Sequence, residues 1–133
     1  MTSRRCLGGM VVHEPISENL DRAVEHSLLG DVEDRRQRLS VANHKPEQIA
    51  VVTRAFRRNP DVIAEVLFRA DGICESCRRP APFKRIDGRP YLEVHHHRPL
   101  ADGGDDTVEN AIALCPNCHR ERHHGANFAT RRD

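Results

Sequence analysis

The chain has 133 residues, which allows one modest domain with an extension but not two independent hydrophobic cores. With 21 basic and 20 acidic residues its formal net charge is only +1, so global charge gives no evidence for a nucleic-acid partner and only local clusters of charge can. A hydrophobic fraction of 38% without any Trp predicts a small core that a bound metal would help to hold together.

The N-terminal part of the chain predicts helices behind an unpatterned terminus. Residues 1–16 show no clear apolar periodicity, and we expect them to be disordered. A helix is predicted from Ser17, a candidate N-cap. Apolar residues then recur at helical spacing: Leu20, Val24 and Leu28. Gly30 interrupts this pattern, and a second helical stretch follows over residues 32–39.

A stronger helix signal follows a segment of uncertain type. Residues 48–56 fit a helix or a strand, and we assign residues 17–58 to a helical N-terminal extension. Asn59 and Pro60 then supply an N-cap and a proline in the first helical position. This helix is predicted to stop before Gly72, where it delivers the chain to a pair of cysteines. Its apolar face is therefore expected to pack beneath a metal site.

Two Cys-x-x-Cys pairs follow, one at Cys74 and Cys77 and the other at Cys115 and Cys118. Four thiolates in two short pairs suit tetrahedral Zn²⁺. Disulfides or buried free thiols are the alternative, but the absence of a secretory segment from this sequence favours a reducing compartment and therefore zinc. Cys6 is unpaired in this scheme and is expected to be a plain thiol in a mobile terminus.

Between the cysteine pairs, the apolar stretch 91–94 predicts a strand that leads into His95, His96 and His97. Consecutive strand side chains point to opposite faces, so His95 and His96 are expected to diverge, one toward a metal and the other toward a water. Glu93 is expected to face solvent. Because the cysteines already fill a zinc site, the surplus histidines predict a second metal; a solvated polar turn or extra zinc ligands are the alternatives.

The remaining elements complete a compact pattern around the second cysteine pair. Residues 102–105, Asp-Gly-Gly-Asp, predict a turn, and residues 111–114 predict a second short strand. Pro116 is placed to begin a helix. On that helix His119 and His123 are four residues apart, so they share one face.

The sequence resembles the HNH nuclease motif in the combination of its parts: the cysteine pairs, the histidine run, the glycine turn, Asn110 and the terminal histidines. The resemblance is to its four-cysteine zinc-bound form and to the branch with the McrA-like restriction endonucleases, and it covers residues 59–125. It implies an α+β fold class, a small ββα-metal, treble-clef-like domain stapled by a four-cysteine zinc and preceded by N-terminal helices. Residues 126–133 would be a C-terminal tail.

The resemblance also implies roles at matching positions. His96 matches the general base that deprotonates a water for attack on a phosphodiester. His95 and His119 match the principal ligands of a catalytic divalent metal, which makes His119 part of the catalytic set. His123 matches a further ligand or phosphate contact. Asn110 matches the asparagine that holds the loop and orients the base.

The sequence departs from the family pattern at His97, where an apolar residue is usual. A shift of one residue in strand register would make His97 rather than His95 the companion ligand. The departure at His97 therefore leaves the identity of the base uncertain by one residue. We prefer His95 as ligand with His96 as base. His124 is an additional candidate that we leave out of the site.

The resemblance implies metal-dependent hydrolysis of DNA phosphodiesters, in restriction-like defence. The catalytic ion would be Mg²⁺ or Mn²⁺, although histidine-rich sites also accept Ni²⁺, Co²⁺ or Zn²⁺. We expect DNA as the partner, a cytoplasmic location and no membrane association. Whether the protein forms a homodimer is left open. The other function classes are a non-catalytic zinc-dependent DNA-binding module and a zinc-stapled protein-interaction adaptor, which would tolerate changes in the histidines.

Overall fold

The computed structural model describes residues 16–128, and the chain divides into two compact units between Ala55 and Phe56. The expectations for residues 1–15, including Cys6, concern a part of the chain outside the described residues. None of the helices in residues 16–128 has the length and apolar character that a bilayer crossing requires.

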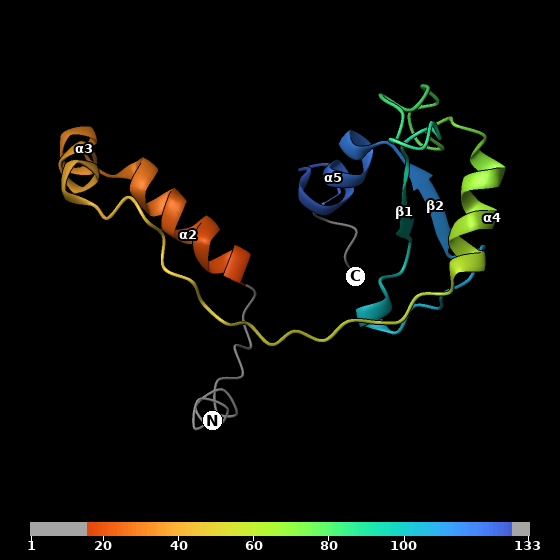
Figure 1. Ribbon diagram of the computed structural model, residues 1–133, viewed down its shortest axis with the longest axis horizontal. Coiled ribbons are helices and arrows are strands. Elements are labelled where there is room, and N and C mark those ends of the chain that lie inside the picture. The colour runs from red at the N-terminus through yellow and green to blue at the C-terminus, as the bar shows by residue number, and fades with distance from the viewer. Residues whose placement is uncertain (1–15, 129–133) are drawn as a thin grey trace. The chain divides into compact units, whose positions relative to one another are not determined.

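The N-terminal unit contains helices α2 (Ile16–Leu29) and α3 (Val32–Val41), which confirms the two predicted helices (Figure 1). Asp31 caps α3, since its Oδ1 accepts a hydrogen bond from the Asp34 N–H at 3.0 Å. The apolar positions that predicted α2 are all exposed: Leu20, Val24 and Leu28. Residues 48–56 form neither a helix nor a strand.

The C-terminal unit is built from α4 (Pro60–Ala70), β1 (Glu93–His96), β2 (Ala111–Leu114) and α5 (Pro116–His124). A single 3₁₀ turn, Leu100–Asp102, lies between the strands in this part of the described chain. The strands pair antiparallel, and Figure 1 shows the two-stranded sheet between α4 and α5. This arrangement confirms the predicted α+β class and its ββα order, with β1 displaced by two residues toward the histidines.

Helix α4 forms because its ends are well capped and one of its faces is apolar. Asn59 Oδ1 accepts from the Asp61 N–H at 3.0 Å, Pro60 occupies the first turn, and Asp71 ends the helix in the left-handed region at φ 51°. Its buried positions recur every four residues and join one core: Val62, Val66 and Ala70 with Cys74, Leu92, Ala111, Ala113 and Leu114. The prediction that α4 packs beneath the cysteines is therefore confirmed.

A polar brace ties α4 to β2 beside this core. The Arg69 guanidinium donates to both carboxylate oxygens of Glu75, at 2.8 and 2.7 Å, and to the Ala111 carbonyl at 2.9 Å. Glu75 Oε1 in turn accepts from the Ala113 N–H at 2.9 Å. The bond from Arg69 lowers the pKa of Glu75, so the carboxylate stays ionised at neutral pH.

Candidate metal centres and active site

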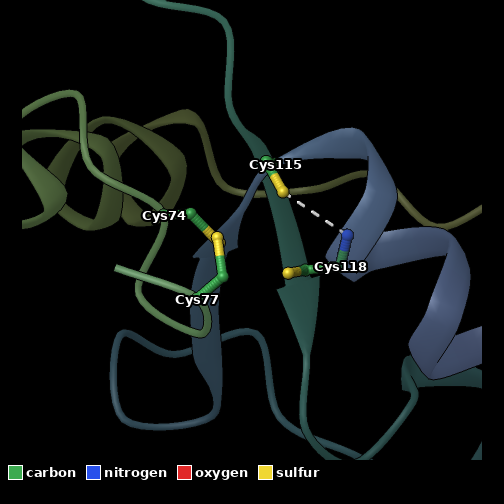
Figure 2. Close-up of side chains that lie close together, drawn as sticks. All are labelled: Cys74, Cys77, Cys115 and Cys118. Carbon is green, nitrogen blue, oxygen red and sulfur yellow. Dashed lines mark hydrogen bonds between the residues drawn. The ribbon is translucent and has the colours of Figure 1, made fainter. Parts of the chain in front are cut away.

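The four paired cysteines converge on one point. The sulfurs of Cys74, Cys77, Cys115 and Cys118 all lie within 4.8 Å of one another. Figure 2 shows that Cys74 and Cys77 come from the loop after α4, and that Cys115 and Cys118 come from the start of α5. Cys115 is also the N-cap of α5, because its Sγ accepts from the Cys118 N–H at 3.4 Å.

The thiol chemistry of this cluster suits a metal. Although burial raises the pKa of Cys74, hydrogen bonds from the backbone N–H groups of Cys115, Cys77 and Ser76 lower it to about 6. Burial, followed by side-chain hydrogen bonds with Cys115 and Cys74, raises the pKa of Cys118 to about 12. Tetrahedral Zn–S bonds of about 2.3 Å place sulfurs about 3.8 Å apart, which the observed cluster accommodates. The four cysteines therefore form a candidate structural metal site.

The histidines of β1 and α5 form a second, separate cluster. Nitrogen ligand atoms of His95, His119 and His123 all lie within 4.8 Å of one another. His119 Nε2 and His123 Nε2 are 3.1 Å apart, as expected from two residues one turn apart on the same helix. His95 meets them from β1, with its ring centroid 5.1 Å from that of His119 and 4.9 Å from that of His123. The structure thus brings together the three predicted ligands of the second metal.

Burial, and then the neighbouring His119 and His123, lower the pKa of His95 to about 4. His95 is therefore neutral at physiological pH, which is the form of histidine that binds metals. An open pocket beside the cluster is lined by Glu93, Arg120 and His124 as well as by His119 and His123. The cluster can hold a divalent metal that remains accessible from outside.

Glu93 belongs to this site, and the prediction that it faces solvent was wrong. Its Oε1 lies 2.8 Å from His119 Nδ1, and its Oε2 accepts from the Tyr91 hydroxyl at 2.7 Å. An ionised carboxylate only accepts, so Nδ1 of His119 carries the proton and Nε2 is left for a metal. The signal in the sequence is the spacing of Glu93 and His95, which places both on one face of the strand.

His96 lies on the opposite face of β1 from His95, as the alternation of a strand predicts. Its side chain is only 8% exposed, and its Nε2 is 2.9 Å from Asp106 Oδ1. Asp106 Oδ2 also accepts from the Asn59 N–H at 2.6 Å, at the start of α4. His96 therefore contacts a carboxylate rather than open solvent, and Asp106 is a site residue that no sequence motif indicated.

Asn110 holds the loop between the strands. Its Oδ1 accepts from the Arg98 N–H at 3.0 Å, and its Nδ2 donates to the carbonyl oxygens of Arg98 and Asp105 at 3.0 and 2.7 Å. Its own carbonyl accepts from the His97 N–H at 2.9 Å. Gly104 is required in this loop, because a Cβ at that position would collide with the Arg98 carbonyl oxygen.

Two histidines that the sequence offered as alternative ligands, His97 and His124, lie outside both clusters. His97, the alternative ligand under a shifted register, is exposed at the end of β1. The ring of His124 lies 6.3 Å from that of His123, and its side chain is exposed. Within residues 16–128, the groups able to hold a metal are the four-cysteine cluster and the cluster of His95, His119 and His123.

Two known proteins are similar to part of this chain. The type IV methyl-directed restriction enzyme EcoKMcrA of Escherichia coli strain K12 is 49% identical over 85 residues, which cover 64% of this chain and 31% of that enzyme. The chain therefore corresponds to less than a third of that relative. The solved structure of the type IV phosphorothioation-dependent restriction endonuclease ScoMcrA aligns at 39% identity with a TM-score of 0.49, over 55% of this chain and 15% of that one.

The family comparison falls on the two clusters. The match to the HNH endonuclease family spans residues 74–125, from the first cysteine of the four-cysteine cluster to the residue after α5. The resemblance stated from the sequence is thereby confirmed. The matched segment contains both sets of converging ligands and the ββα order that positions them, so the similarity to HNH endonucleases coincides with the two candidate metal sites.

Proposed function

We propose that the chain is a metal-dependent endonuclease that hydrolyses DNA phosphodiester bonds. The observation that carries this proposal is the cluster of His95, His119 and His123, because a structural zinc held by four cysteines leaves these imidazoles without a structural purpose. The nuclease family of residues 74–125 supports the same reading. Restriction-like defence follows from the restriction enzymes to which the chain is similar.

The two clusters would hold different metals. Cysteine sulfur favours Zn²⁺ at the structural site. At the histidine cluster we propose Mg²⁺ or Mn²⁺, with Ni²⁺, Co²⁺ or Zn²⁺ as alternatives. Mg²⁺ prefers oxygen ligands, so the three nitrogen donors favour the alternatives over Mg²⁺. When bound, this ion supplies positive charge that polarises the phosphate and stabilises the leaving oxygen.

We propose His96 as the general base. Asp106 supports this role, because a carboxylate that accepts from Nε2–H leaves Nδ1 of His96 as the proton acceptor. Asn110 would be a positioning residue, since its contacts hold the loop that follows His96. His119 would act as a ligand whose orientation is set by Glu93.

Around this site we propose residues 59–125 as the nuclease domain and residues 17–58 as an N-terminal extension whose helices end at Val41. A homodimer would let two such sites cut both strands of a duplex, and a cytoplasmic location would fit the reduced thiols. A non-catalytic zinc-dependent DNA-binding module is the alternative function. It would bind DNA with the cysteine cluster intact and would not require His96.

The test is conversion of supercoiled plasmid to nicked and linear forms. Purified protein is incubated with Mg²⁺, Mn²⁺, Ni²⁺ or EDTA, beside His96→Ala and the exposed neighbour His97→Ala as a matched control. We expect metal-dependent cutting by the wild type and by His97→Ala, and none by His96→Ala with its zinc retained. Cutting lost only in His97→Ala would move the base by one residue. No cutting by the wild type, together with DNA binding that survives His96→Ala, would favour the binding module.

A further inference from the structure

The segment between the first cysteine pair and β1 forms a hairpin that stands away from the core. We call residues 83–91 the 83–91 hairpin; an antiparallel bridge joins Lys84 to Pro90 within it. Residues 82–90 are exposed without interruption. In Figure 1 this green segment extends beyond one end of the sheet. The tip of the hairpin therefore adds nothing to the core of the domain, and its defined shape needs another reason.

The hairpin is nevertheless well braced by its own contacts. The Arg85 N–H donates to the Arg89 carbonyl at 2.7 Å, and the Tyr91 N–H donates to the Phe83 carbonyl at 3.0 Å. The rings of Phe83 and Tyr91 stack with centroids 4.7 Å apart. Gly88 makes the turn at φ 89°. A rigid projecting element can enter a partner's surface with little loss of conformational entropy.

The side chains at the tip combine an apolar residue with cations. Ile86 is fully exposed at the turn. Three cations lie in the same segment, Lys84, Arg85 and Arg89, against one carboxylate, Asp87, which pairs with the Arg89 guanidinium at 2.8 Å. The excess of positive charge is local, since the chain as a whole has a formal net charge of only +1. An excess of cations around one apolar residue suits a polyanion that also offers apolar groups between its charges. A protein surface would require a larger apolar contact area.

The base of the hairpin is joined to the histidine cluster. Tyr91 is the last residue of the hairpin, and its hydroxyl donates to Glu93, which contacts His119. Arg85 also lies over the Tyr91 ring, 5.4 Å from its centroid. A substrate held by the hairpin would therefore lie close to the metal ligands, and the hairpin is fixed with respect to them.

We propose that the 83–91 hairpin is a DNA-contacting element that enters a groove of the duplex, with Lys84 and Arg89 on phosphates and Ile86 against the groove floor. A two-stranded ribbon fits the major groove, where thymine methyl groups provide apolar contacts. Contacts to phosphates position a protein on DNA and are largely independent of sequence. This inference rests on the proposed function and identifies the surface by which duplex DNA is held for cleavage.

The test is affinity for a fluorescent duplex, measured by anisotropy over a range of salt concentrations in EDTA at a concentration that leaves the structural zinc in place. Lys84→Gln with Arg89→Gln should weaken binding roughly tenfold or more at about 0.1 M salt and reduce the slope of log Kd against log salt by about 1.8. Ile86→Ser should weaken binding roughly threefold to tenfold with an unchanged slope. The matched control, Arg36→Gln with Arg38→Gln on α3, removes the same charge and should change neither quantity.

A fourth variant guards against misfolding as an explanation. Asp87→Asn removes the only carboxylate of the hairpin and should tighten binding, which a damaged fold cannot do. A wild type that binds and cuts DNA while all hairpin variants bind equally well would overturn this inference and leave the proposed function standing. A wild type that neither binds nor cuts DNA would overturn the proposed function, and the inference with it.

Discussion

The four-cysteine cluster and the histidine cluster share helix α5 but have different surroundings. Cys74 is completely buried and belongs to the hydrophobic core with Val66 and Leu114. His123 is exposed and lines an open pocket. Closed ligand sets are typical of structural metals, whereas catalytic sites keep an accessible position. Cys77 is exposed as well, but the cysteine cluster reaches into the core whereas the histidine cluster borders an open pocket. This difference supports the proposal that the first cluster serves folding and the second contact with a substrate.

Helix α5 connects the two roles. It has 9 residues and none of them is buried, so an apolar face contributes little to its position. Cys115 instead caps its start, Cys118 lies in its first turn, and the following turns carry His119 and His123. The metal held by the cysteines would therefore orient the histidines as well. Changes at the two clusters should consequently be asymmetric: loss of the cysteines should disturb both sites, and loss of a histidine only one.

The largest effect is expected from removal of the structural metal. Cys118→Ser, or zinc extraction by a strong chelator, should unfold the C-terminal unit, because metal binding contributes about 10 kcal/mol or more in small zinc domains. Circular dichroism and zinc content measure the change. Ser76→Ala, an exposed change between Cys74 and Cys77 that keeps all four thiols, is the control and should melt near the wild-type temperature. A Cys118→Ser protein that keeps its melting temperature and its cleavage activity would contradict the structural role of the cluster.

A histidine ligand should give the opposite pattern. Loss of a metal ligand's hydrogen-bonding partner can reduce activity roughly 100-fold, so loss of a ligand itself in His123→Ala should reduce cleavage by more. The zinc content and the melting temperature of this variant should stay near those of the wild type. Calorimetry should show that the zinc-loaded variant also no longer binds Ni²⁺ or Mn²⁺. His124→Ala, one residue further and outside the cluster, should retain both. Equal losses in the two variants would argue against the assigned ligand set.

Local signals in the sequence account for most of what was predicted correctly. Asn59 and Pro60 define the start of α4 through short-range capping, and Pro116 does the same for α5. The pairing of His119 with His123 follows from helical periodicity alone. Motif order then related these pieces to a known domain, which the family match over residues 74–125 confirms.

The residues that were missed depend on contacts across the fold. Asp106 reaches His96 only after the loop held by Asn110 has folded back, and a single sequence gives no spacing rule for such a contact. Glu93 was assigned to solvent because alternation shows which strand residues share a face but not what covers that face. Helical spacing likewise placed Leu20 on the apolar face of α2 but did not show whether anything covers that face, and the side chain is exposed.

Glu93 offers a way to sharpen the contrast between the clusters, because it acts on a ligand and not on the core. Glu93→Gln should weaken binding of the second metal by roughly 10-fold to 100-fold, as loss of a carboxylate partner does for other metal-bound histidines. Calorimetry with Ni²⁺ on the zinc-loaded protein measures this directly. Glu121→Gln on the exposed part of α5 removes the same charge without touching His119. Equal affinities for Glu93→Gln and wild type would leave Glu93 as a structural residue only.

The smallest expected effect concerns the brace beside the cysteine cluster. Glu75→Gln weakens the paired bonds from Arg69 at 2.8 and 2.7 Å and should lower the free energy of unfolding by about 1.5 kcal/mol. Glu65→Gln, exposed on α4, removes a charge that acts on Arg69 through space without a hydrogen bond, and it should cost about 0.3 kcal/mol. Thermal denaturation of the zinc-loaded proteins measures both. Glu75 follows Cys74 in the chain, but the hydrogen bonds of the brace involve no metal-ligand side chain. Cleavage below the melting transition should therefore be unchanged, and a cleavage defect in Glu75→Gln would mean that the core and the histidine site are coupled.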